Sequence, residues 1–165
     1  MDSLIQKIIL PVDFSPASER AARFGCTLAR SLGAHVYLIH VVDAATSKGP
    51  MADVSGSDRH RYLEARTAIA DLAARIGRGA QVTTEVRIGP VDAGITSAVI
   101  AYGADLVVMS THGRTGLPHL LFGSVAEQVI RTALCPVLVM CESGKVRMHR
   151  AAVESSETTQ AAQPA

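Results

Sequence analysis

Residues 104–130 read ADLVVMSTHGRTGLPHLLFGSVAEQVI, which combines an apolar segment, a glycine-containing loop and the start of a helix. The segment 104–109 is apolar almost throughout, which is typical of a strand in the middle of a parallel sheet. Ser124 and Glu127 have the spacing of a capping box, so we expect Ser124 to be the N-cap of a helix. The residues expected on the buried face of that helix are Val125, Val129, Ile130 and Ala133.

Strand and helix signals alternate on both sides of this segment. A helix is predicted after each of the first four strands. In the first helix, Phe24, Leu28 and Leu32 recur at i, i+4 and i+8 with Ala17, Ala21 and Gly25 beside them, which predicts one buried face. That helix has Ser15 as its predicted N-cap and Gly33 at its end. The predicted strands are 7–12, 35–42, 81–88, 104–109 and 136–140, of which 81–88 alternates as an edge strand does.

This order of elements predicts an α/β fold with a parallel sheet and helices on both of its faces. In such sheets, ligands bind beyond the carboxyl ends of the strands, at the point where the strand order reverses. We expect the first and fourth strands to flank that point. We also expect one domain over residues 1–142 and a disordered C-terminal tail over 143–165, because the latter is rich in small and polar residues.

Composition narrows the class of protein. Of the 165 residues, 16 are Lys or Arg and 15 are Asp or Glu, and this balance argues against a polybasic nucleic-acid binder. Aromatic residues make up only 4%, which argues against binding of single-stranded nucleic acid by stacking. Three cysteines without a CxxC pattern, and the lack of a leader-like or membrane-spanning segment, favour a soluble cytoplasmic protein with packed thiols.

Two strand ends carry residues suited to a ligand. Asp13 follows the first strand, where a carboxylate can accept hydrogen bonds from a ribose. Alternatively, Asp13 only supports the start of the following helix. Gly113 and Gly116 permit close backbone approach, and Gly123 leads into a helix N-terminus, where unpaired amides favour a phosphate. Alternatively, these glycines form a flexible loop before an ordinary helix cap.

Other motifs are missing or have a structural interpretation. The chain lacks the P-loop and dinucleotide-binding patterns, and its six histidines lack zinc-site spacing. His40 lies in an apolar strand and is interpreted as a core residue, whereas His112 in the glycine loop is a candidate ligand contact. The arginines of the second helix, Arg59, Arg61 and Arg66, are expected on a solvent-facing side.

The residues DFS (13–15), LIHVV (38–42) and the segment 107–130 followed by PVLV resemble the universal stress protein family over about residues 5–140. Nucleotide-binding members of that family carry G-x2-G-x9-G-[ST]. Gly113, Gly123 and Ser124 match its second half, and Ser110 stands in place of the first glycine. The resemblance implies a three-layer, doubly wound, five-stranded parallel sheet of order 3-2-1-4-5, of the adenine-nucleotide α-hydrolase-like kind.

The resemblance also implies an ATP site, with Asp13 on the ribose and the backbone of Val41 against the adenine. Mg²⁺ or Mn²⁺ would accompany ATP, held through Asp13 or Ser124. A homodimer is implied through antiparallel pairing of Val137, Leu138 and Val139, with a further protein partner unknown. The implied nucleotide-binding residues are Pro11, Val12, Asp13, Val41, Met109, Ser110, Gly113, Arg114, Gly116, Gly123, Ser124 and Val125.

Three functions remain open from the sequence. The first is a stress-response module that binds ATP and hydrolyses it slowly or not at all. The second is a dimeric interaction protein of the same fold that binds no nucleotide, which Ser110 in the glycine position favours. The third is a weak ATP hydrolase, for which His112 is the candidate general base.

Overall fold

In this computed structural model, the chain is described over residues 4–43, 56–111, 123–141 and 146–149. These residues form one sheet of order β3-β2-β1-β4-β5-β6. The strands are β1 (Lys7–Pro11), β2 (His35–Asp43), β3 (Gln81–Gly89), β4 (Leu106–Ser110), β5 (Val137–Met140) and β6 (Val146–His149). The helices are α1 (Pro16–Leu32), α2 (Gly56–Ile76), α3 (Val91–Tyr102) and α4 (Ser124–Thr132).

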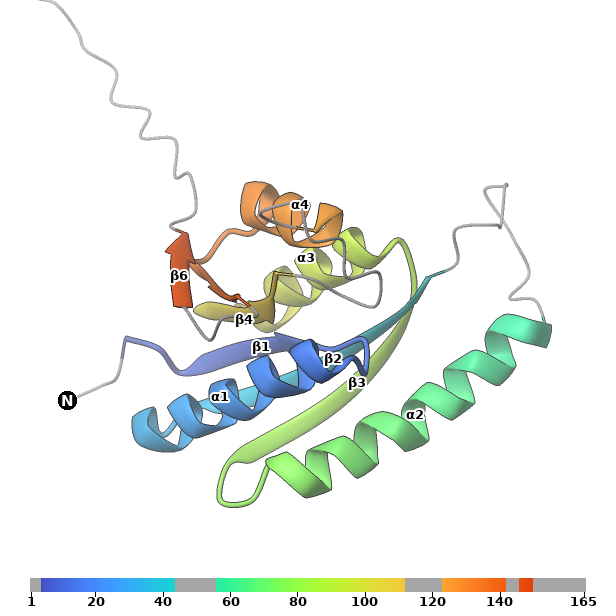
Figure 1. Cartoon of the computed structure of the whole chain (residues 1–165), viewed down its shortest axis with the longest axis horizontal. Helices are drawn as coiled ribbons and strands as arrows, with labels where there is room; N and C mark the ends of the chain where they lie inside the picture. The colour runs from blue at the N-terminus through green and yellow to red at the C-terminus, as the bar shows by residue number, and fades with distance from the viewer. Residues whose placement is uncertain (1–3, 44–55, 112–122, 142–145, 150–165) are drawn as a thin grey trace, which may run out of the picture.

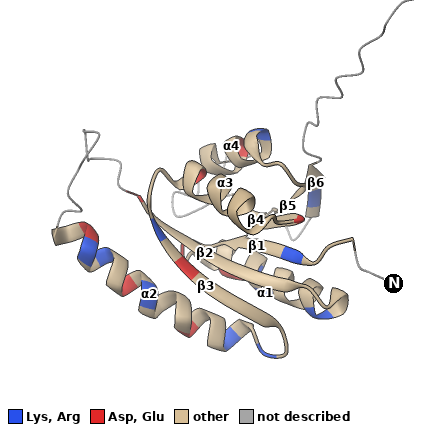
Figure 2. Ribbon diagram, turned by 180° about the vertical axis from the view of Figure 1, so that it is seen from behind, with Lys and Arg blue, Asp and Glu red and all other residues tan. Residues whose placement is uncertain are grey.

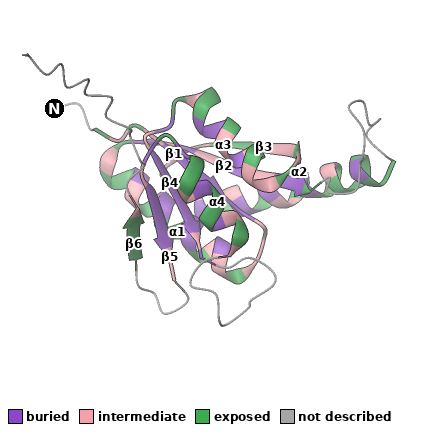
Figure 3. Ribbon diagram, turned by 90° about the horizontal axis from the view of Figure 1, so that it is seen from above, coloured by how far each residue is buried: buried purple, intermediate pink, exposed green. Residues whose placement is uncertain are grey.

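The sheet is the middle of three layers (Figure 1). Helices α1 and α2 cover one face, where Leu10, Leu38 and Leu72 belong to one buried cluster. Helices α3 and α4 cover the other face, where Ile9 and Val107 belong to a second cluster. Figure 3 shows the central strands almost entirely buried. Strands β1 to β5 pair in parallel, so the predicted three-layer fold and the order 3-2-1-4-5 are confirmed.

Helix α1 begins and ends as the sequence predicts, and of its predicted buried face only Phe24 is exposed. The Ser15 hydroxyl accepts a hydrogen bond from the Ser18 amide at 3.2 Å, and Gly33 ends the helix with φ 69°. The residues facing the sheet are small ones such as Ala22, Gly25 and Cys26, whereas Phe24 is 36% exposed. A side chain at Gly25 would collide with Leu10, so small residues let the helix approach the strand closely.

The predicted cap of α4 is wrong by one residue. Gly123 is the N-cap and makes no side-chain cap bond, and Ser124 is the first helical residue. The Gly123 amide donates a hydrogen bond to the Thr111 carbonyl at 2.7 Å. A Cβ at position 123 would lie 3.0 Å from that oxygen, so this close backbone contact favours glycine at the cap.

Strand β6 corrects the prediction for the C-terminal tail. Residues 146–149 were expected to be disordered, but they pair antiparallel with β5 and add a sixth strand to the sheet. Val146 and Met148 remain 44% and 66% exposed, so backbone pairing, more than side-chain burial, holds this strand. The edge of β5 that was expected to receive a second subunit through Val137, Leu138 and Val139 is therefore occupied by β6. Residues 143–145 and 150–165 lie outside the described residues.

Two of the three cysteines are packed in the core, as expected from the sequence. Burial raises the pKa of the Cys26 thiol, and burial together with the nearby Asp105 raises the pKa of Cys135 to about 11. Both thiols are therefore neutral at physiological pH.

On α2, positively and negatively charged residues are interspersed along the ribbon (Figure 2). Within the described part of the chain, no helix is both long and apolar enough to cross a lipid bilayer.

Candidate functional site

A cleft of about 370 Å³ lies at the carboxyl ends of β1 and β4. These strands are neighbours in the sheet, and the chain order reverses between them, as expected for a ligand site in this fold. Residues 112–122, which include Gly113, Arg114, Gly116 and His112, lie outside the described residues. The residues that the sequence analysis named and that line the cleft are Pro11, Val12, Asp13, Val41, Met109, Ser110, Gly123, Ser124 and Val125.

Asp13 stands at one side of the cleft, just beyond β1. Its Oδ1 accepts a hydrogen bond from the Ser15 amide at 3.0 Å, and its own amide donates to the Ser18 hydroxyl at 3.3 Å. The carboxylate therefore does support the start of α1, as the structural alternative proposed. Asp13 also lines the cleft, and a carboxylate can accept about four hydrogen bonds, so the same group can support the helix and contact a ligand. The two interpretations of Asp13 are compatible.

The N-terminus of α4 stands at the other side. Thr111 continues from β4 and its amide donates to the Met140 carbonyl at 3.0 Å, while its carbonyl accepts from the Gly123 amide. Ser124, Val125 and Ala126 then line the cleft with the first turn of the helix. The first amides of a helix have no partner within it, and the helix dipole adds a partial positive charge there. This side of the cleft is suited to an anion.

An apolar wall forms a further side of the cleft. Val41, Ile95 and Met109 are almost completely buried and line the cleft together with Val91. Val91 and Ile95 come from the first turns of α3 and were not named as site residues from the sequence. Their spacing of four residues directly after Gly89-Pro90 is the signal that could have indicated them, because it places both on one helix face at a strand end.

His40 was interpreted as a core histidine, but it also lines the cleft. Its Nδ1 lies 2.7 Å from the Val12 carbonyl, and because a carbonyl only accepts, Nδ1 carries the proton. The imidazole ring also lies against Phe14, with ring centroids 4.6 Å apart. His40 thus links the second strand to the turn that carries Asp13.

Arg61 lies on a solvent-facing side of the second helix, as expected from the sequence. Its side chain is 52% exposed, yet it lines the cleft from the first turns of α2. Its Nη1 donates to the Asp43 carbonyl at 3.0 Å and lies 3.5 Å from Asp58 Oδ1. Helical periodicity shows which face a residue occupies, but not which strand end that face approaches.

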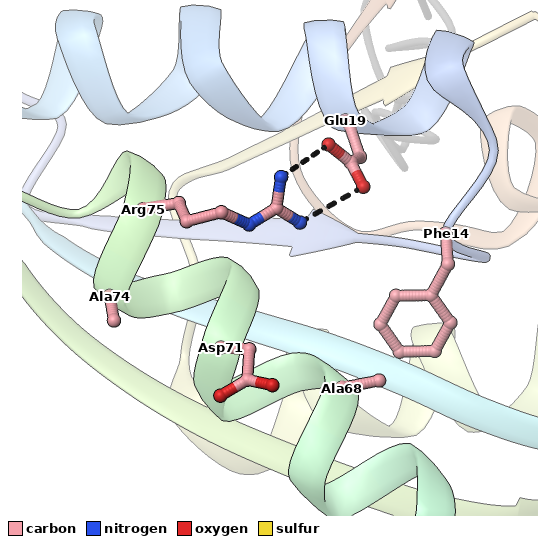
Figure 4. Close-up of a pocket in the computed structure, with 6 residues that line it drawn as sticks. All are labelled: Phe14, Glu19, Ala68, Asp71, Ala74 and Arg75. Carbon is pink, nitrogen blue, oxygen red and sulfur yellow. Dashed lines mark hydrogen bonds and ion pairs between the residues drawn. The ribbon is translucent and has the colours of Figure 1, made fainter.

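A second cavity, of about 660 Å³, lies between α1 and α2 (Figure 4). Its one arginine, Arg75, donates from Nη1 and Nη2 to Glu19 at 3.3 and 3.2 Å. Asp71 adds a further negative charge, and Phe14, Ala68 and Ala74 complete the wall. With its cation paired and its other charges acidic, this cavity does not suit an anionic ligand, so the cleft between β1 and β4 is the better candidate.

Comparison with known proteins gives concordant results. The family model described as the universal stress protein family matches residues 4–140. A universal stress protein of Methanocaldococcus jannaschii, MJ0531, is 36% identical over 144 residues, which cover 84% of each chain. The solved structure of MJ0577 from the same organism superposes with a TM-score of 0.72 at 26% identity, over 84% of this chain and 96% of that chain.

Two more distant solved structures are described as nucleotide complexes. One is a universal stress protein in complex with cAMP, with a TM-score of 0.63 and 20% identity over 84% of this chain and 98% of that chain. The other, from Archaeoglobus fulgidus, is in complex with dAMP, with a TM-score of 0.61 and 23% identity over 82% of this chain and 98% of that chain. At these identities the likeness shows a shared fold.

Proposed function

Because the chain belongs to the universal stress protein family, we propose that it is a cytoplasmic, nucleotide-dependent interaction module that binds ATP in the cleft between β1 and β4. One observation carries the proposal. The cleft brings together a carboxylate, Asp13, the N-terminus of a helix, α4, and an apolar wall. The carboxylate suits the ribose hydroxyl groups of a nucleotide, the helix N-terminus suits its phosphates, and the apolar wall suits its base.

The ligand would lie with its ribose at Asp13 and its base against Val41, Ile95 and Met109. Its phosphates would approach the first amides of α4 at Ser124 and Val125, where a dipole end favours negative charge. The cAMP and dAMP complexes of the two structural neighbours support an adenine nucleotide as the ligand class. The triphosphate is the finer proposal, and the family motif completed by Gly123 and Ser124 supports it.

A divalent cation fits this site as a companion of the phosphates. Mg²⁺ typically keeps several waters and binds through one or two protein groups plus substrate phosphates. Among the described residues, no cluster of three His, Cys, Asp or Glu side chains could hold a metal ion unaided. Asp13 and Ser124, both of which line the cleft, would therefore share the ion with ATP, and the ion would neutralise part of the phosphate charge.

We propose slow or absent hydrolysis. Around the N-terminus of α4, the described lining residues are Ser110, Thr111, Gly123 and Ser124, which offer hydroxyls and amides but no base. His40 lines the cleft, but it lies on β2, and β1 and β4 separate it from α4. A homodimer through β5 remains a prediction, and it requires that β6 first leave the edge of β5.

Nucleotide released from the denatured, purified protein tests this proposal. We expect the wild-type chain to release an adenine nucleotide and Gly123→Val to release much less, because a side chain there would press against the Thr111 carbonyl at the phosphate end. Gly56→Val is the matched control, since position 56 has open space around it at the start of α2. Equal nucleotide content in the wild-type and Gly123→Val proteins would contradict the site.

The second candidate is an interaction protein of the same fold that binds no nucleotide. Ser110, in the position of the first motif glycine, is the observation that favours it. Protein that carries no nucleotide, and that also binds none of the ATP added to it, would support this candidate instead.

A further inference from the structure

Arg61 has a place in the cleft that neither the sequence motif nor the family resemblance assigns. Among the described residues that line the cleft, it is the only lysine or arginine, and Asp13 and Asp43 are acidic. Its Nη1 donates to the Asp43 carbonyl at 3.0 Å and lies 3.5 Å from Asp58 Oδ1. Asp58 is itself only 7% exposed, so this end of α2 is anchored to the end of β2.

The position of Arg61 along the cleft follows from the sheet order. Asp43, to which Arg61 is bonded, is the last residue of β2, whereas the N-terminus of α4 follows the end of β4. Strand β1 lies between β2 and β4, so two strand spacings, about 10 Å, separate these ends. A nucleotide with its phosphates at Ser124 therefore directs its base toward β2. Arg61 stands at the base end and away from the phosphate end.

The chemistry of a guanidinium suits this place. It is planar, stays protonated, has five N–H donors and stacks on aromatic faces. The contacts to Asp43 and Asp58 both use Nη1, so Nε and Nη2 can still donate to a ligand. A purine base held against Val41 and Ile95 on one side presents its other face and its ring nitrogens toward the mouth of the cleft.

We propose that Arg61 is a ligand-binding residue that covers the base end of the cleft and contacts a purine base through its guanidinium plane. This inference rests on the proposed nucleotide site and deepens it. Arg61 holds the base and makes no contact with the phosphates. Its contribution to affinity is therefore the same for any ligand that carries the base, with or without phosphates.

Titration of adenosine, AMP and ATP against the full-length wild-type, Arg61→Ala and Arg61→Lys proteins tests this inference. We expect Arg61→Ala to weaken all three ligands by a similar factor of about tenfold, as for a partly desolvated cation–π contact. Arg61→Lys recovers little of this loss, because an ammonium group keeps the charge but not the plane. Arg66→Ala is the matched control on the same helix, where Arg66 lies 6.0 Å from the Tyr62 ring centroid, and it leaves all affinities unchanged.

The possible failures are distinguishable. If the wild-type protein binds none of the three ligands, the proposed function fails, and the inference fails with it. If it binds them but Arg61→Ala binds them equally well, only the inference about Arg61 is wrong. Weakened ATP binding with unchanged adenosine binding would also overturn it, because Arg61 would then contact phosphates. Thermal unfolding of each variant shows whether a loss of affinity comes from a loss of folded protein.

Discussion

At the scale of single residues, Phe14 shows the clearest backbone strain in the described chain. Its φ is 63°, a left-handed conformation that bulky residues rarely adopt, and it is the only described non-glycine residue with a positive φ. The strain is located directly after Asp13, at the cleft, where the ring also contacts His40. The turn that presents Asp13 is therefore held by tertiary contacts against a local preference.

Two substitutions at Phe14 separate the strain from the ring. Phe14→Ala and Phe14→Gly both remove the contact with His40, but only glycine adopts this φ without steric cost. We expect the glycine variant to be more stable than the alanine variant by about 1 kcal/mol, as measured by urea unfolding. An alanine variant of equal or greater stability would contradict a strained turn.

Cys135 predicts a pH dependence on the alkaline side. Its pKa is about 11 in the folded chain against an ordinary 9.0, so between these values the unfolded thiol ionises while the folded thiol stays protonated. The folded state then binds more protons, and stability falls as pH rises through this window, by up to about 2–3 kcal/mol. Unfolding free energies should therefore fall more steeply with pH in the wild-type protein than in Cys135→Ala. Parallel curves for the two proteins would contradict this prediction.

The roles of single residues in the site were the hardest feature to predict from the sequence. The spacing of Ser124 and Glu127 fits a capping box, but Gly123 is the N-cap. The reason is that the start of the helix lies against the carbonyl of Thr111, which belongs to another segment of the chain. Arg61 has the periodicity of a solvent-facing helical residue, and only the packing of α2 beside the end of β2 brings it to the cleft. Both outcomes depend on which segments meet, and a local pattern does not contain that information.

At the scale of elements, α3 packs closely against β2 beside the cleft. Gly94 lies in the first turns of α3, and a Cβ there would lie 2.8 and 3.0 Å from the two methyl carbons of Val41. Val41 is β-branched and nearly buried, so it cannot move aside easily. Gly94 thus allows the helix to support the apolar wall at close range.

Gly94→Ala tests this contact. Alanine gains about 1 kcal/mol of helix propensity, but overpacking in a core costs about 1–3 kcal/mol, so we expect a net loss of stability of about 1 kcal/mol and weaker ATP binding. Gly56→Ala, at a helical glycine with no atoms nearby, is the control and should leave both unchanged or slightly improve stability. Chemical unfolding and ATP titration measure the two effects. A Gly94→Ala protein that matches the wild type in both would show that the wall has room.

Helices and strands were well predicted where the sequence pattern is uniform, either apolar throughout or regularly alternating between apolar and polar residues. The apolar segment 104–109 becomes the central strand β4, and the alternating segment 81–88 becomes the edge strand β3. In α1, the predicted face is confirmed for Ala21 and Gly25, which are buried, and Leu28 and Leu32 pack against the core, whereas Phe24 is exposed. Close packing of a helix on a sheet favours small residues, and the spacing of the large apolar residues placed Phe24 on this face wrongly.

At the scale of the whole molecule, β6 closes one edge of the sheet. An exposed edge strand has unpaired backbone groups and favours pairing with another chain. Apolar and polar residues alternate over only four positions in 146–149, directly after a turn-like segment that contains Ser143-Gly144. The sequence pattern therefore did not indicate a strand. Its partner β5, with three buried apolar residues, supplies the edge on which it forms.

Removal of β6 should change the state of association. We expect a chain that ends at residue 142 to self-associate more strongly than the full chain, because Val137, Leu138 and Val139 then have an unpaired edge. Sedimentation velocity over a range of concentrations measures this. The same distribution of species for both chains at every concentration would mean that β6 does not protect the edge of β5.

The measurement that tests the nucleotide site most directly is calorimetric titration of ATP, with Mg²⁺, into the full chain and into Asp13→Ala. We predict saturable binding of one ATP per wild-type chain, because the cleft between β1 and β4 offers one carboxylate and one helix N-terminus. Asp13→Ala should weaken this binding about ten- to hundredfold, as loss of a hydrogen bond to a charged group does. No heat of binding at millimolar ATP, or equal binding by the two proteins, would contradict an ATP site between β1 and β4.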